Sequence, residues 1–150
     1  MSRTFAQVPL GLWRDPRFTA LSDDGQLALL YLWSGPHSSS AGISVVFDGY
    51  ASLDRKWEND RWQVARQELE DAGFIARDPT TETVMVIDYF KANKPSSLRH
   101  IAAVKNQIAN VQSEELQTLA QKALDSALSG STMAASGPSP KLLALVNGKQ

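Results

Sequence analysis

The chain has 150 residues, a formal net charge of −1 at pH 7 and no cysteine. This length holds one domain of ordinary size with short appendages, and the near-neutral charge argues against a strongly basic protein that binds nucleic acid without selectivity. The lack of cysteine excludes disulfides and thiolate metal sites, and since no targeting signal and no apolar run of about 18 residues occurs, we expect a cytoplasmic protein with no membrane partner.

A first helix is expected after Ser22, which is a good N-cap. Asp23 and Asp24 follow it and suit the positive end of the helix dipole. The pair Gly35-Pro36 should end the helix. Its apolar residues fall on one wide face, which predicts a central place in the core: Leu27, Leu29, Leu30, Tyr31, Leu32 and Trp33.

A short strand and a second helix are expected next. The segment Ile43 to Val46 is rich in β-branched residues and follows a serine-rich loop, which favours a strand. In the following helix, Tyr50, Leu53 and Trp57 are spaced by three and four residues, which is the spacing of one buried face.

The pattern from residue 59 onward predicts a third helix. Trp62, Ala65, Leu69 and Ala72 recur at spacings of three, four and three, which places them in one stripe. The helix should begin at residue 59 or 60, so that very few residues separate it from the second helix.

A β-hairpin is predicted directly after this helix. Gly73 should end the helix, because glycine readily takes the left-handed conformation. Proline presets the backbone angle of a tight turn at residues 78–81, and the β-branched run 83–87 favours a strand over a helix.

Two more helices should follow a boundary at residues 94–97. A serine of the pair Ser96-Ser97 is expected to cap a fourth helix, and Ser113 opens a fifth. The fourth should carry Leu98, Ile101, Ala102, Lys105 and Ile108 on one face, and the fifth Leu116, Leu119, Ala120, Ala123, Leu124, Ala127 and Leu128.

The order of these elements predicts a mainly helical α+β fold. Two closely spaced helices with a strand before them and a hairpin after them make a winged helix-turn-helix, with a three-helix core and a hairpin wing. We expect this domain in residues 1–94, a helical pair packed on it in 95–129, and a flexible tail in 130–150.

The tail ends in a cluster of apolar residues that allows two interpretations. It is either a frayed or locally docked chain end, or a short helix that binds a partner. The residues concerned are Leu142, Leu143, Leu145 and Val146.

The sequence also resembles a known family over Phe5 to Asn110. The matching segments read VP (8–9), WRDPRF (13–18), LS (21–22), LLYL (29–32), GPH (35–37), ELEDAGFI (68–75) and DYFKAN (88–93). They are similar to phage and prophage replication proteins whose N-terminal winged helix is like that of replisome organisers and primosomal DnaD proteins. The resemblance implies a protein that binds duplex DNA or a replisome partner, such as the host helicase or its loader, while a phage origin is opened.

The third helix carries the candidate groove readers of this fold. Gln63 and Gln67 on its polar face could pair with adenine, and Asn59 and Arg61 lie at its start, where Arg61 could reach phosphate or guanine. Asp60 would repel phosphate there. The alternative is an ordinary solvated face.

Two further arginines have different expected roles. Arg66 lies near the edge of the buried stripe, so either its stem packs with the guanidinium reaching solvent or it forms an ion pair with Glu70 four residues on. Arg77 lies in the hairpin, where a wing can contact the DNA backbone.

A run of cations without an acid follows the hairpin. Such residues would neutralise phosphates without reading sequence, and the affinity would fall with salt. The alternative is that they are scattered solvating charges. The run contains Lys91, Lys94, Arg99, His100 and Lys105.

The sequence gives little basis for an enzyme, a metal or a cofactor. His37 and His100 are the only histidines, and neither has a carboxylate at metal-ligand spacing. Three functions therefore remain open: a DNA-binding replication-initiation protein, an interaction protein that associates with itself or a host replication protein, and a transcriptional regulator.

Overall fold

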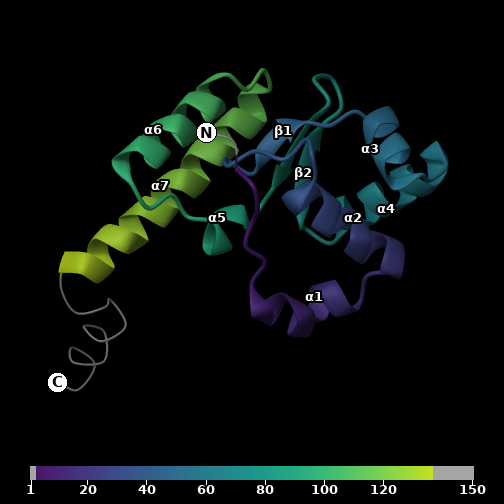
Figure 1. Cartoon of the computed structure of the whole chain (residues 1–150), viewed down its shortest axis with the longest axis horizontal. Coiled ribbons are helices and arrows are strands. Elements are labelled where there is room, and N and C mark those ends of the chain that lie inside the picture. Colours follow the sequence, from purple (N-terminus) through teal and green to yellow (C-terminus); the bar gives the residue numbers. More distant parts are fainter. Residues whose placement is uncertain (1–2, 137–150) are drawn as a thin grey trace.

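The computed structural model describes residues 3–136, with side chains up to residue 130. The protein is mainly helical with one small antiparallel sheet, so the predicted α+β class is confirmed (Figure 1). Its elements are η1 (Leu10–Arg14), α1 (Pro16–Thr19), α2 (Asp23–Ser34), β1 (Ile43–Val45), α3 (Asp48–Arg55), α4 (Asn59–Asp71), β2 (Ile75–Asp78), β3 (Thr83–Val86), α5 (Tyr89–Ala92), α6 (Leu98–Ala109) and α7 (Glu114–Ser136).

The three strands are arranged in the order β1–β3–β2, and both pairs are antiparallel. β2 and β3 form the predicted hairpin, in which Asp78 lies opposite Thr83. On the other edge of β3, Ile43 of β1 lies opposite Met85. β3 is buried along its whole length, which suits its continuous β-branched and apolar sequence.

Helices α2 and α4 pack on each other at the centre of the core. Leu29 of α2 and Trp62 and Leu69 of α4 are fully enclosed. Ser22 caps α2 as predicted, since its Oγ accepts a hydrogen bond of 3.0 Å from the N–H of Gly25. The predicted role of Gly73 is also confirmed, because it follows α4 with a left-handed φ of 79°.

The predicted buried faces of α2 and α3 are partly wrong. Ala51 is the buried residue of α3, whereas Tyr50 and Leu53 face solvent, with Leu53 78% exposed. Leu27 of α2 is exposed as well. The small side chain of Ala51 lets α3 approach α4 closely, and this packing, rather than the spacing of the large residues, sets the orientation of the helix. Trp57 is not on the helix, because α3 ends at Arg55.

The C-terminal helices form as predicted, but their buried faces are narrower. Val104 and Ile108 are the buried residues of α6, and Leu98 at its start is 87% exposed. In α7 the fully buried residues are Leu116, Ala120 and Leu124, whereas Leu119 is exposed. The stripe of α7 is otherwise confirmed, since Ala123, Ala127 and Leu128 pack at its edge.

The linker predicted from residue 130 is wrong for its first part. Helix α7 continues through Gly130 to Ser136. Extending a helix that is already nucleated costs less than forming a new one, so a locally weak helical sequence can follow a strongly packed one. The partner-binding residues predicted in the tail, Leu142, Leu143, Leu145 and Val146, lie outside the described residues.

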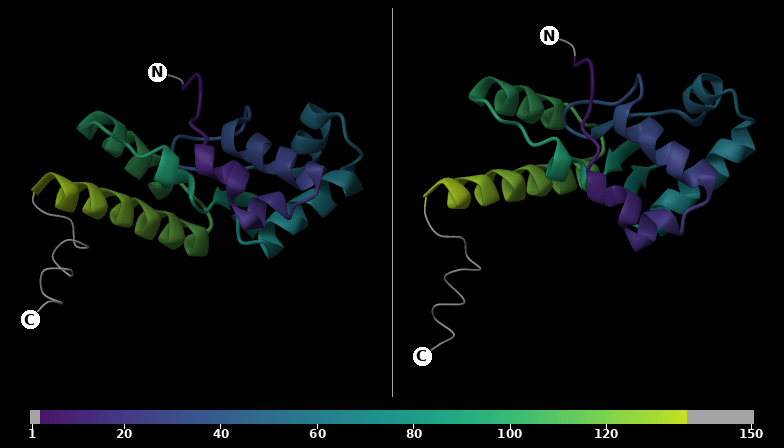
Figure 2. Two further views of the ribbon diagram at one scale, coloured as in Figure 1. Left: turned by 90° about the horizontal axis from the view of Figure 1, so that it is seen from below. Right: turned by 60° about the horizontal axis from the view of Figure 1, so that its bottom comes forward.

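Helices α3 and α4 lie at one end of the molecule and helices α6 and α7 at the other (Figures 1 and 2). α7 runs along α6 and also contacts α5 and both strands of the hairpin. The predicted reading helix and the predicted basic run therefore belong to different ends of the protein.

Candidate functional site

The polar face of α4 is exposed, as the sequence predicts for a reading helix. Asn59, Gln63 and Gln67 all lie on the surface. Their amides are partly engaged within the protein. Asn59 Oδ1 accepts from the Ser52 hydroxyl at 3.0 Å, and Gln67 Nε2 donates to Asp71 at 3.0 Å. Gln63 Nε2 makes only a long contact of 3.4 Å to Asp48, so its amide is the freest to meet a ligand.

Arg61 is held by a carboxylate at the start of α2. Its Nε and Nη2 donate to the two oxygens of Asp24 at 2.7 and 2.8 Å. The guanidinium also lies over the Trp57 ring, 4.3 Å from the ring centroid. Hydrogen bonding to Arg61 holds the pKa of Asp24 below its usual value, so the pair is charged at neutral pH. A phosphate would have to compete with Asp24 for this arginine.

The other two arginines of α4 and the hairpin are bound internally. Arg66 is buried, and its guanidinium donates to Asp48 at 2.9 Å and to Glu70 at 3.0 Å. Of the two arrangements that the sequence left open, the structure has the ion pair with Glu70. Arg77 donates to Glu82 at 2.8 Å, and its side chain is only 11% exposed. Arg77 therefore presents little surface to a DNA backbone, contrary to the role expected for it.

A basic groove lies away from α4, which contributes no residue to its lining. It is an open depression of about 1120 Å³, lined by segment 3–7, loop 34–40 and the stretch 89–107 through α5 and α6. Its charged lining residues are Arg3, Lys94, Arg99 and the titratable His100. Among the described residues, none of those lining the groove carries a carboxylate. The groove is therefore a concentration of positive charge in a chain that is nearly neutral.

The N-terminal segment is fixed against the rest of the groove by hydrogen bonds. Gln7 and Asn93 bond reciprocally, with the Gln7 N–H donating at 2.7 Å and the Asn93 amide returning a bond of 2.8 Å to the Gln7 carbonyl. Trp33 Nε1 donates to the same carbonyl at 2.7 Å. These bonds hold Arg3 close to α5.

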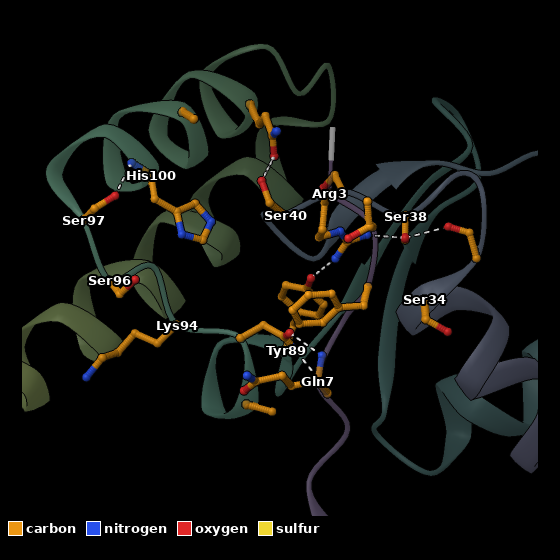
Figure 3. A pocket seen from close by; sticks show the side chains of 18 of the residues that line it. Arg3, Gln7, Ser34, Ser38, Ser40, Tyr89, Lys94, Ser96, Ser97 and His100 are labelled. Carbon is orange, nitrogen blue, oxygen red and sulfur yellow. Dashed lines mark hydrogen bonds between the residues drawn. The ribbon is translucent and has the colours of Figure 1, made fainter. Parts of the chain in front are cut away.

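The side chain of Arg3 lies at the centre of the groove. It donates to the hydroxyls of Tyr89 and Ser38, while His100 projects into the space from α6 (Figure 3). Burial raises the pKa of Tyr89, and the charge of Arg3 offsets only part of that rise, so the phenol stays protonated at neutral pH. Because both partners of Arg3 are neutral, its charge remains available to an anion.

The structure brings together only part of the predicted basic run. Lys94 and Arg99 line the groove, with Lys94 at the rim, where its side chain runs toward α7 (Figure 3). Lys91 instead lies 3.3 Å from Asp88. Lys105 is exposed on α6 and does not line the groove. Arg3 could not be found from sequence patterns, because its contact with Tyr89 spans 86 positions.

Comparisons with protein families, with curated proteins and with solved structures found no match. Within residues 3–136, no three acidic, histidine or cysteine side chains gather as metal ligands. In the same part of the chain, no helix is both long and apolar enough to cross a bilayer. The exposed face of α4 and the basic groove are therefore the two candidate functional surfaces.

Proposed function

We propose that the chain is a winged-helix DNA-binding protein that acts when phage or prophage DNA replication is initiated. Support for the winged helix comes from the order α2–β1–α3–α4–β2–β3, with β1 paired to the outer edge of β3. Only residues 56–58 separate α3 from α4, which is the close spacing of a helix-turn-helix.

The observation that carries the proposal is the exposed amide face of α4. Asn59 and Gln63 lie in its N-terminal half, which is the part of a recognition helix that meets base edges, and Gln67 follows one turn further on. Glutamine and asparagine amides can donate to N7 and accept from N6 of adenine at once. Because Arg61 and Arg66 are neutralised by acids, base contacts should contribute more to duplex binding here than phosphate contacts.

The role in replication rests on the resemblance to phage replication proteins. It adds a host helicase or helicase loader as the partner, engaged through the apolar tail residues Leu142 to Val146. Deleting residues 141–150 should abolish capture of that host protein in a pull-down while duplex binding remains. Capture that survives the deletion would assign the contact to another surface.

Duplex binding is tested by fluorescence anisotropy with phage-origin and random DNA across a salt titration. The double variant Gln63→Ala/Gln67→Ala should lower affinity for origin DNA by about 30-fold or more, since two bidentate contacts of about 1–3 kcal/mol each sum to at least about 2 kcal/mol. Gln121→Ala is a matched control, because Gln121 makes the same bond to the acid four residues on, at 2.9 Å to Asp125. Equal affinity of both variants for origin DNA would contradict the proposal.

An interaction module is a second candidate, favoured by the exposed face of α3. Phe47, Tyr50 and Leu53 are all solvent-exposed, and the Phe47 and Tyr50 rings lie 5.1 Å apart. A second copy of the chain could cover this face, as the self-association alternative requires. Sedimentation of Leu53→Asp beside the wild type decides this: a dimer that the substitution dissociates supports self-association, and a monomeric wild type excludes it.

A further inference from the structure

We propose that the basic groove binds single-stranded DNA at a site separate from the α4 face. This inference goes beyond duplex binding by α4, since no residue of α4 lines the groove, and α6, which does line it, lies at the other end of the molecule from α4 (Figures 1 and 2). A protein with both surfaces could hold a duplex and a strand displaced from it at the same time.

The first support is that the positive charge of the groove is not compensated. Four of the six arginines outside the groove in the described part of the chain hold a carboxylate within 3.1 Å: Arg17, Arg61, Arg66 and Arg77. In the groove, Arg3 instead contacts two hydroxyls. Positive charge without a nearby acid attracts phosphates, and the local field matters more than the net charge of −1.

The second support is the size of the groove together with an exposed aromatic ring. Its volume of about 1120 Å³ exceeds what a single phosphate or a small metabolite requires, since small-molecule sites hold about 300–1,000 Å³. Phe5 lines the groove beside Arg3 and is 73% exposed. An exposed ring next to cations is the arrangement on which successive bases of a single strand stack.

The third support concerns the shape of the ligand. The lining of the groove includes the buried Tyr89 and the half-buried Ser38, together with exposed residues of the N-terminal segment and of the stretch that leads into α6. The bases of a duplex are paired and stacked on one another, so they could not stack on Phe5. A flexible single strand can follow the groove and offer unpaired bases.

The test uses the full chain and measures anisotropy with labelled oligothymidylate and with duplex DNA. Lys94→Glu/Arg99→Glu should weaken oligothymidylate binding by about tenfold or more. The slope of log affinity against log salt concentration should also decrease, by an amount that corresponds to about one phosphate contact or more. Lys105→Glu/Lys122→Glu, on exposed positions of α6 and α7 outside the groove, changes the net charge equally and should leave the affinity within about twofold. Equal losses in the two double variants would overturn the proposal, because the effect would then be one of net charge alone.

A second comparison tests the aromatic contact. Phe5→Ala should weaken oligothymidylate binding by about tenfold, whereas Leu10→Ala, at a residue that is 90% exposed outside the groove, should not. Displacement of the oligonucleotide by inorganic phosphate at equal phosphate concentration would assign the groove to free anions and overturn the proposal. Thermal unfolding of each variant confirms that it is folded.

The α4 variant keeps the two inferences distinguishable. Gln63→Ala/Gln67→Ala should weaken duplex binding and leave oligothymidylate binding unchanged, while the groove variant should do the reverse. If Lys94→Glu/Arg99→Glu lowers only duplex affinity, the groove is part of the duplex site and the single-strand inference is wrong. If Gln63→Ala/Gln67→Ala weakens neither duplex binding nor oligothymidylate binding, the proposed duplex function fails while the groove inference stands.

Discussion

Glu68 of α4 binds both polar groups of Ser22, the residue that caps α2. Its Oε1 accepts from the Ser22 backbone N–H at 2.6 Å, and its Oε2 accepts from the Ser22 hydroxyl at 2.7 Å. Gly25 lies against this carboxylate, since a Cβ there would come within 2.8 Å of Oε2. The contact fixes the start of α2 on the C-terminal part of α4, and thereby orients the helix that carries the proposed reading face.

Glu68→Gln should lower the free energy of unfolding by about 1–2 kcal/mol. The amide nitrogen cannot accept a hydrogen bond, so one of the two Ser22 donors loses its charged partner. Urea unfolding measures the change, and Glu115→Gln, at an exposed position of α7, is the control. Equal stability of the two variants would show that solvent satisfies Ser22 as well as the carboxylate does.

Signals confined to a few neighbouring residues predicted much of the fold. The serine cap at residue 22, the helix end at Gly73 and the hairpin after it are set by local backbone chemistry, and each is confirmed. The orientation of α3 could not be read in this way. It depends on how closely Ala51 lets that helix approach α4, and this is a property of the packed pair.

The candidate site was harder to predict, because charges pair across the fold. Arg61 was expected to meet phosphate, but Asp24 is 37 positions away in sequence and reaches it from α2. Two of the groove's lining cations, Lys94 and Arg99, belong to the basic run that is visible in the sequence. The third cation, Arg3, comes from the opposite end of the described chain and is placed by the bonds between Gln7 and Asn93.

Gly42→Ala should destabilise the protein by at least about 2 kcal/mol. Gly42 has a φ of 70°, and a Cβ would lie 2.6 Å from the Tyr89 ring, so strain and overlap act together. Gly49→Ala is the matched control, because a Cβ at that position in α3 meets nothing within 4 Å and alanine favours a helix. A thermal melt should show a lower Tm for Gly42→Ala and an equal or higher Tm for Gly49→Ala. Equal melting temperatures would contradict the packing of Tyr89 on Gly42.

Asp48→Ala should cost about 3 kcal/mol of stability. Asp48 accepts from Arg66 Nε at 2.9 Å and from Trp62 Nε1 at 2.8 Å, and the Arg66 side chain is only 10% exposed. Removing the acid leaves a buried guanidinium that Glu70 alone must balance. In a double-mutant cycle by chemical denaturation, Asp48→Ala/Arg66→Met should lose less than the sum of the two single variants. Additive losses would mean that the ion pair contributes nothing beyond packing.

Asp24→Asn should raise affinity for duplex DNA by about three- to tenfold if Arg61 faces the DNA. The amide cannot accept both bonds that now hold the guanidinium, at 2.7 and 2.8 Å, so the arginine becomes available to a phosphate with which it pairs more strongly. Asp23→Asn is a close control, because Asp23 also lies in the first turn of α2 and its replacement changes the net charge equally. Adding Arg61→Ala to Asp24→Asn should cancel the gain in anisotropy titrations. If Asp23→Asn raises affinity as much as Asp24→Asn does, net charge is the cause, and Arg61 has no part in binding.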